Sequence, residues 1–242
     1  MNEVKPYHSE GGSKKSQVSK MFNRIAPYYD FLNRLLSLGI DTIWRKKAIQ
    51  RLQGDQPKVI LDVATGTADV AIETARKLNP EKIIGLDISS EMLDIGRQKI
   101  KKKGLDTIIT LEEGDSEALP YPDQTFDAIT VAFGVRNFEN LEKGLKEMQR
   151  VLKDDGQIVI LEFSRPRIFP IKQLFNAYFK YILPLIGRLT SKDPKAYSYL
   201  YESVQAFPDG DDFVNILLKT GFKSNQCTPL TLGICSLYSG RK

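Results

Sequence analysis

The fold of this chain is decided by one stretch, VILDVATGTADVA at residues 59–71. Apolar residues lead into Asp62, small residues follow from Ala64 to Ala68, and an apolar pattern with helical spacing comes next. That order predicts a strand, a tight turn and the start of a helix. Such a turn usually holds a cofactor, and the candidates are a dinucleotide, a phosphate, another adenosine-bearing ligand, or no ligand at all.

Strand and helix patterns alternate along most of the remaining chain. The expected strands are residues 58–63, 82–87, 108–113, 126–133 and 157–163, and the expected helices are residues 68–78, 91–103, 141–152 and 211–222. Repeated βα units with apolar strands are typical of a parallel sheet covered by helices on both faces. The ending FKSNQCTPLTLGICSLYSG predicts two final strands around a short turn. The sequence therefore predicts an α/β fold.

The N-terminal residues lie outside this alternation. Residues 1–17 have the polar composition of a disordered tail. Residues 18–55 predict a helical cap made of short helices that end at Pro27 and Gly39. Asp41 is expected to be the N-cap of the third helix.

Residues 164–205 interrupt the alternation with an aromatic-rich helical insertion. Its most apolar segment, residues 167–189, is a poor transmembrane helix because lysine, arginine and proline interrupt it. The aromatic residues interleaved with basic ones there are Phe169, Phe175, Tyr178, Phe179 and Tyr181. This composition fits a helix that lies at a membrane surface and admits a lipid. It fits equally well a lid whose apolar side packs on the core.

The composition is that of a soluble globular protein. Of the 242 residues, 41% are apolar and 27% are charged, which suits one large α/β domain. The net charge of +5 suits an anionic membrane surface or nucleic acid. Lysine and arginine are dispersed, and no base-stacking platform or reader motif is present, so we expect no nucleic-acid partner. No N-terminal stretch has the apolar core of a signal peptide, which favours the cytoplasm.

Histidine, thiol and metal chemistry are not indicated. The single histidine, His8, lies in the polar N-terminal segment, so an ordered catalytic histidine is not expected. Cys227 and Cys235 lie eight residues apart without a CxxC motif or a Cys/His cluster. We therefore expect reduced thiols and no metal site.

Two phosphate-binding motifs are missing from the turn at residues 59–71. A dinucleotide fingerprint needs three glycines spaced as GxGxxG, whereas this turn contains Gly66 alone. A P-loop needs GxxxxGK followed by Ser or Thr, and the sequence has no such run. Neither a dinucleotide nor a nucleoside triphosphate is therefore expected.

Acidic residues follow the next two expected strands. Asp87 ends the second strand 21 residues after Gly66, close to the ~20-residue separation at which an acidic side chain meets ribose hydroxyls. Asp115 and Ser116 follow the third strand and offer a carboxylate and a backbone amide to an adenine edge. Each aspartate taken singly is also a common turn or capping residue. Because ligands of open α/β sheets bind at the carboxyl ends of strands, the three positions together favour adenosine.

The charges around the turn favour a cationic ligand. Asp62 and Asp69 flank the small residues. S-adenosylmethionine has no phosphate and carries a sulfonium and an ammonium group, so carboxylates suit it better than lysines. We therefore expect S-adenosylmethionine as the cofactor.

Five segments of the chain together resemble one known family. They read YYDFLNRLLSLGIDTIWRKKAI, LDVATGTADVA, LDIS, GDSEALPYPDQTFDAITVAFGVRNF and EMQRVLKDDGQIVILEFSRP, within a resemblance that spans about residues 18–240. They are similar to the UbiE/MenG family of quinone-biosynthesis C-methyltransferases. The resemblance implies a class I S-adenosylmethionine-dependent methyltransferase domain over residues 18–242, with a Rossmann-like seven-stranded sheet whose last strand is antiparallel. It places the helical insertion before strand six, over the substrate site.

The resemblance also assigns cofactor positions. Thr67 joins Asp87, Asp115 and Ser116 at positions where the family contacts its cofactor. The expected cofactor-binding residues are Asp62, Gly66, Thr67, Asp87, Asp115 and Ser116. The chain departs from many members at three positions, where glycine is replaced by Thr65 and Ala68 and serine by Ala132. These departures are peripheral to Asp87, so cofactor binding is still expected.

The implied reaction is methylation of a ring carbon of a polyprenylated quinol. A phenolic pKa near that of tyrosine, ~10, means that a cationic neighbour or a base must assist ionisation of the quinol at neutral pH. We expect Arg136 to stabilise the developing oxyanion, with a water molecule as proton acceptor, and Asn137 and Tyr29 to orient the quinol. Asp30 is the alternative base. A structural ion pair is the alternative role of Arg136.

The substrate is less determined than the chemistry. Demethylmenaquinol is favoured, and a benzoquinol of ubiquinone biosynthesis is the alternative. A soluble small molecule would fit if the insertion were an ordinary lid. A polyprenyl substrate implies peripheral membrane contact, and the sequence leaves open whether the protein forms a homodimer.

Overall fold

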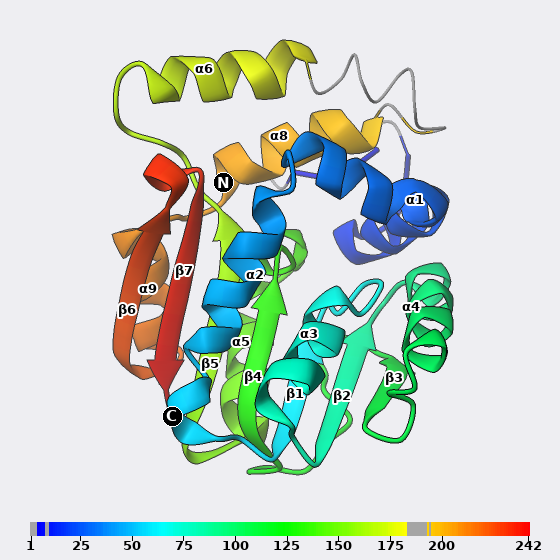
Figure 1. Ribbon diagram of the computed structural model, residues 1–242. Helices are drawn as coiled ribbons and strands as arrows, with labels where there is room; N and C mark the ends of the chain where they lie inside the picture. The colour runs from blue at the N-terminus through cyan, green and yellow to red at the C-terminus, as the bar shows by residue number, and fades with distance from the viewer. Residues whose placement is uncertain (1–3, 8–9, 183–192, 194) are drawn as a thin grey trace.

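A seven-stranded sheet forms the centre of the protein (Figure 1). The structure, a computed structural model, describes residues 4–7, 10–182, 193 and 195–242. The strands are β1 (Val59–Val63), β2 (Lys82–Asp87), β3 (Ile109–Glu113), β4 (Phe126–Ala132), β5 (Leu152–Phe163), β6 (Lys223–Leu230) and β7 (Cys235–Arg241). They lie in the order β3-β2-β1-β4-β5-β7-β6, with β1 to β5 parallel and β7 antiparallel to both β5 and β6. The predicted α/β sheet with an antiparallel last strand is confirmed.

Helices cover both faces of the sheet (Figure 1). The α-helices are α1 (Lys14–Leu36), α2 (Ile40–Gln50), α3 (Asp69–Leu78), α4 (Ser90–Lys102), α5 (Leu141–Val151), α6 (Ile171–Ala177), α8 (Lys195–Ala206) and α9 (Asp211–Lys219). Shorter helical segments are η1 (Gln53–Asp55), η2 (Val135–Asn137), η3 (Tyr178–Ile182) and η4 (Thr231–Gly233). Apolar side chains of α2, α3 and α4 pack on one face, and those of α5 and α9 pack on the other.

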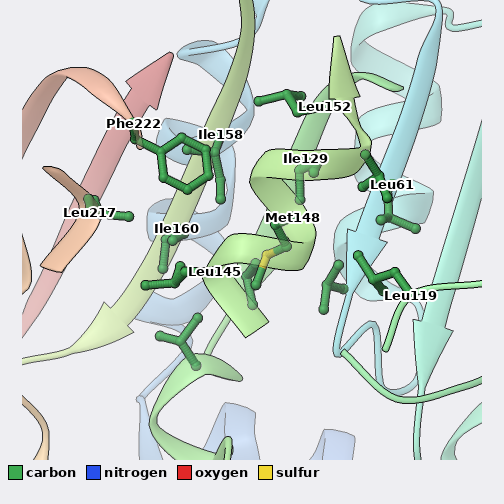
Figure 2. Packing of buried hydrophobic residues seen from close by; sticks show 14 of the residues in the cluster. Leu61, Leu119, Ile129, Leu145, Met148, Leu152, Ile158, Ile160, Leu217 and Phe222 are labelled. Atoms are coloured by element: carbon green, nitrogen blue, oxygen red, sulfur yellow. The ribbon is translucent and has the colours of Figure 1, made fainter. Parts of the chain in front are cut away.

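The face beneath α5 and α9 holds a continuous apolar core (Figure 2). Leu145 and Met148 of α5 and Leu217 of α9 pack with Ile129 of β4 and Ile160 of β5. The spacing of three between the two α5 residues puts both on the side that faces the sheet. Burying an apolar side chain of this size stabilises the fold by about 1.5–3 kcal/mol.

The N-terminal segment differs from the predicted disordered tail over residues 1–17. Helix α1 already begins at Lys14, and Tyr7 is buried, with its backbone N–H donated to Gln17 and its hydroxyl donated to Asp193. The polar composition of residues 1–17 gave no sign that Tyr7 is buried, because its partners Gln17 and Asp193 lie 10 and 186 residues away in the sequence. His8 lies outside the described residues.

The cap contains fewer helix ends than predicted. Helix α1 continues through Pro27. The hydrogen bond that proline removes is outweighed here by apolar packing of residues such as Met21 and Leu32. Gly39, in the left-handed region at φ 78°, is the N-cap of α2. Asp41 lies in the first turn of α2, where it accepts a hydrogen bond from a neighbouring side chain and caps no backbone N–H, so the capping prediction is wrong.

Helices α1, α6 and α8 lie beyond the carboxyl ends of the parallel strands (Figure 1). They share an apolar cluster that includes Met21, Phe175, Phe179 and Tyr199. The aromatic residues of the insertion therefore divide, because Phe175 and Phe179 are buried while Phe169 is exposed. Residues 183–192 of the insertion lie outside the described part. Within the described ranges, no helix has the length and apolar character needed to cross a membrane.

The α5 core gives a stability prediction. Leu145→Ala should lower the free energy of unfolding by about 2–5 kcal/mol, because it removes buried methyl groups and leaves a cavity against the sheet. Lys146→Ala, at the adjacent exposed position, should change it by less than about 0.5 kcal/mol. Urea unfolding followed by circular dichroism measures both variants. Equal effects of the two substitutions would contradict this account of the core.

Candidate active site

The turn after β1 is held from beneath by a buried carboxylate. Asp62 accepts hydrogen bonds from the hydroxyls of Thr65 and Thr130, each at 2.6 Å. Burial raises the pKa of Asp62 to about 6, against the opposing effect of these two hydroxyls. Ala64, Gly66 and Ala68 all have positive φ, a region that costs glycine little and that the two alanines adopt less readily. Asp62 therefore supports the turn and does not line a cavity.

Asp87, at the end of β2, ties this turn to the next loop. One carboxylate oxygen accepts the backbone N–H of Gly66 at 2.8 Å, and the other accepts that of Ser89 at 2.9 Å. Burial raises the pKa of Asp87 to about 6, although both amides oppose the shift. Asp87 also lines a cavity, and each carboxylate oxygen retains a further acceptor site. A ribose hydroxyl that donates a hydrogen bond fits that position.

The loop after β3 completes the polar wall of the same cavity. Asp115 and Ser116 both line it, as the sequence predicted. Lys15 of α1 also lines it and lies 2.5 Å from Asp115 and 3.3 Å from Glu117. Sequence reasoning missed Lys15 because a lysine in a polar N-terminal segment carries no signal of a partner 100 residues away. These ion pairs hold α1 against the loop after β3.

The cofactor cavity, as we name this space, has a volume of about 660 Å³. Its wall combines the polar strand ends with apolar side chains of α1, β2 and α4, namely Val18, Phe22, Leu86 and Met92. Asn137 also lines it, and its buried Oδ1 accepts no hydrogen bond from any described residue. The sequence placed Asn137 beside the quinol, whereas the structure places it on the cofactor side.

Thr67 and Asp30 meet each other away from both cavities. The Thr67 hydroxyl donates to Asp30 at 2.6 Å, and the ammonium group of Lys99 lies 2.8 Å from the same carboxylate. Lys99 also pairs with Asp69 at the start of α3. These contacts join α1 to α3 and α4. Thr67 therefore positions the turn through its side chain, and the Asp30 carboxylate is engaged in a salt bridge.

A second and larger cavity adjoins the first. This substrate cavity, as we name it, has a volume of about 1620 Å³ and lies between the cap, the insertion and the end of β5. Its lining is mainly aliphatic and aromatic, with Trp44 of α2 and Phe163 of β5 among the rings. Three aromatic residues line both cavities: Phe22, Tyr29 and Phe133. The two cavities therefore meet at side chains.

Arg136, on η2, lines the substrate cavity with one edge of its guanidinium unpaired. Its Nη1 donates to Glu162 Oε1 at 2.9 Å and to the Phe133 carbonyl. The carbon of the guanidinium lies 5.6 Å from the centre of the Phe163 ring. Its buried Nε has no hydrogen-bond partner among the described residues. The predicted structural ion pair is therefore present, and Nε beside it is a buried donor without a partner among the described residues. An anionic oxygen fits the open edge.

Glu162 is a functional residue that the sequence prediction missed. It is 0% exposed, and burial raises its pKa while the Arg136 guanidinium opposes the shift. Because a buried carboxylate needs a partner, an acidic residue inside the apolar strand VILEF was an available signal. Glu162 lies behind Arg136 and lines neither cavity.

Tyr29 lies at the junction of the two cavities and keeps its proton. Burial raises the pKa of Tyr29, although its neighbours Asn33, Arg45 and Arg136 oppose the shift. The hydroxyl is therefore a donor at neutral pH. Tyr29, Arg45 and Arg136 all line the substrate cavity.

Comparisons with known sequences identify the family of the chain. The ubiE/COQ5 methyltransferase family matches residues 10–242. The demethylmenaquinone methyltransferase of Bacteroides fragilis is 52% identical over 239 residues, which are 99% of this chain and 97% of that protein. The ubiquinone/menaquinone biosynthesis C-methyltransferase UbiE of Geotalea daltonii is 46% identical over 230 residues, which are 95% of this chain and 97% of that protein.

Solved structures share the fold at low identity. A SAM-dependent methyltransferase from Aquifex aeolicus matches with a TM-score of 0.57 and 18% identity, over 79% of this chain and 88% of that one. Phosphoethanolamine N-methyltransferase 2 of Haemonchus contortus, solved with S-adenosyl-L-methionine, matches with a TM-score of 0.56 and 14% identity, over 76% of this chain and 48% of that one. The predicted fold, methyltransferase class and S-adenosylmethionine dependence are confirmed. The chain belongs to the ubiE/COQ5 methyltransferase family.

Proposed function

We propose that this protein methylates a ring carbon of a polyprenylated quinol, with demethylmenaquinol as its substrate. The observation that carries the proposal is the junction of the cofactor cavity with a large apolar cavity, where Arg136 presents an unpaired edge. The names of the relatives agree, since that of Bacteroides fragilis is a demethylmenaquinone methyltransferase. The Geotalea daltonii relative, named for ubiquinone and menaquinone alike, keeps a benzoquinol as the second candidate.

The cofactor cavity fits S-adenosylmethionine by the chemistry of its wall. Asp87 would accept the ribose hydroxyls, and the loop with Asp115 and Ser116 would hold the adenine edge. The unpaired Oδ1 of Asn137 suits a donor such as the ammonium group. When bound, S-adenosylmethionine supplies a methyl group that its sulfonium has already activated.

The substrate side of the junction prepares the quinol for attack. The open edge of Arg136 stabilises the oxygen of the hydroxyl that ionises, in a cavity whose apolar walls strengthen the interaction. The hydroxyl of Tyr29 donates a hydrogen bond to the same quinol. The released proton goes to solvent beside Arg136, because Asp30 is occupied by Thr67 and Lys99 and is the weaker candidate for the base. Holding the methyl donor and the ring carbon in the geometry of the reaction supplies the remaining rate acceleration.

The polyprenyl chain would leave through the mouth of the substrate cavity. Leu38, between α1 and α2, and Leu174 of α6 both line this cavity, yet they are 83% and 63% exposed. Other exposed apolar residues lie on the same insertion: Ile168, Phe169, Tyr181 and Ile182. Lys172 and Lys180 are interleaved with them. We therefore propose that the cap, residues 18–55, and the insertion, residues 164–205, rest on the cytoplasmic membrane surface.

A soluble small molecule is the weaker candidate substrate. The walls of the substrate cavity are mainly apolar and come from α1, α2, α6 and α8 together, which is more apolar surface than a small water-soluble phenol would cover. An apolar mouth with exposed leucines would also serve no purpose for such a substrate.

Removing the charge of Arg136 tests the chemistry. Arg136→Met should lower kcat for a short-chain demethylmenaquinol by about 100- to 1,000-fold, the usual effect of removing a donor to a developing oxyanion. Calorimetry should show unchanged affinity for S-adenosylmethionine, because Arg136 does not line the cofactor cavity. Arg97→Met, at an exposed position on α4, is the matched control and should leave kcat unchanged. Full turnover by Arg136→Met would remove this residue from the mechanism.

Cofactor binding should depend on pH through Asp87. Its pKa of about 6 in the folded protein means that protonation below that pH removes an acceptor for the ribose. The dissociation constant for S-adenosylmethionine should be constant above about pH 7 and rise by up to about 10-fold per pH unit below 6. Titration calorimetry between pH 5 and 8 measures this. Asp87→Asn should bind weakly with a flatter profile, and an identical slope in both proteins would assign the dependence to another group.

The cavity mouth gives a test of membrane contact. The double variant Leu38→Ser, Leu174→Ser should bind anionic phospholipid vesicles at least about 10-fold more weakly, because each leucine would otherwise bury its side chain in lipid. Turnover of a detergent-solubilised short-chain quinol should change much less. Leu218→Ser, which alters a leucine 62% exposed on α9, is the matched control. Wild-type protein that does not sediment with vesicles would exclude the membrane proposal.

A further inference from the structure

The substrate cavity contains a buried carboxylate that the chemistry described above does not use. Asp41, in the first turn of α2, lines this cavity and is 4% exposed. Its Oδ1 accepts the hydroxyl of Ser37 at 2.7 Å. Its Oδ2 accepts no hydrogen bond from the described residues, although Arg45 Nη2 lies 3.1 Å away in poor alignment. A buried acceptor left without a donor is unfavourable, so a donor from a ligand would complete this site.

Arg45 pairs with the carboxylate and helps to hold it in place. It follows Asp41 by one helical turn and pairs with it while also donating to Asp69 at 2.7 Å. Asp69 in turn pairs with Lys99 of α4. Asp69 and Lys99 thus extend this network to α3 and α4, and Asp41 lines the cavity with an Oδ2 that accepts no well-aligned hydrogen bond from the described residues. This arrangement is preorganised to bind a hydroxyl group.

Asp41 and Arg136 line the same cavity, and aromatic side chains connect the elements that carry them. Trp44 lies on the same side of α2 as Asp41, and its ring centre is 6.2 Å from that of Phe163. The guanidinium of Arg136 lies 5.6 Å from the centre of the same Phe163 ring. The Phe163 ring therefore lies between the helix that carries Asp41 and the guanidinium of Arg136. A hydroquinone carries one hydroxyl that ionises and a second, para to it, that remains a donor.

We propose that Asp41 Oδ2 accepts the hydrogen bond of the second quinol hydroxyl, the one next to the prenyl-bearing carbon. Arg136 holds the hydroxyl next to the carbon that receives the methyl group. This assignment rests on the proposed function. It makes Asp41 a binding residue that selects a reduced ring, because an oxidised quinone presents a carbonyl there and would place two acceptors against each other. The pairing also fixes which ring carbon faces the cofactor cavity.

A substrate–variant cycle tests the assignment. The substrates are 2-geranyl-1,4-naphthoquinol and 3-geranyl-1-naphthol, which is the same ring without the hydroxyl next to the prenyl-bearing carbon. Wild type and Asp41→Ala are assayed with both, and kcat/KM is measured by transfer of a labelled methyl group. The preference of wild type for the quinol should exceed that of the variant by about 10- to 100-fold, the usual effect of one hydrogen bond to a charged group. Intrinsic reactivity cancels in this ratio.

Two further variants separate binding from structure. Asp41→Asn keeps a neutral acceptor, so it should fold as wild type and reduce the preference by a smaller factor, about 3- to 10-fold. Ser37→Ala removes the hydrogen bond to the other oxygen and should leave the preference within about twofold of wild type. Calorimetry with S-adenosylmethionine should give the same affinity for all four proteins.

The outcomes are distinguishable. A preference for the quinol that is equal in wild type, Asp41→Ala and Asp41→Asn overturns the role of Asp41 and leaves quinol methylation intact. A preference lost equally in Ser37→Ala assigns a structural role to Asp41 and also overturns the proposal. Failure of wild type to methylate either ring overturns the proposed function and this assignment with it.

Discussion

One buried carboxylate at the end of β2 fixes the geometry on which the site depends. Asp87 accepts amide hydrogens from Gly66 and Ser89, so the turn after β1 and the loop after β2 are held at a single point. Asp62 holds the same turn from beneath through two threonine hydroxyls. Burial opposes the charge on both aspartates, which is why their pKa values are raised to about 6. Burying the two aspartates therefore costs some stability, and it holds the polar residues of the cofactor cavity in position before a ligand binds.

The parts of the fold that follow from local pattern could be predicted from the sequence. β1 and β2 are short apolar runs with an aspartate at or next to the last position, and α5 carries its buried residues at helical spacing. Asp87 and Asp115 could be placed at one common site because the ends of parallel strands meet at one edge, and both line the cofactor cavity. These predictions needed only the order of the elements.

The remaining site residues depend on contacts between distant segments. Lys15 reaches Asp115 only because α1 crosses the loop after β3, and a polar N-terminal sequence gives no sign of that crossing. Thr67 was expected beside the cofactor, but its hydroxyl finds Asp30 of the cap. Asp41 has the residue type of a helix cap, yet Gly39 takes that position, and the Asp41 carboxylate instead contacts Ser37 and Arg45 at the wall of the substrate cavity. Packing of the cap on the sheet decides all of these outcomes.

The boundary between the two cavities consists of the rings of Phe22, Tyr29 and Phe133. Side-chain rotations are far faster than rearrangements of helices or domains. An aperture framed by rings can therefore widen or narrow without any movement of the sheet, whose strands are fixed on either side. Passage between the two cavities would then depend on side-chain rotations. The slow steps of the catalytic cycle would be the entry and release of the prenylated substrate.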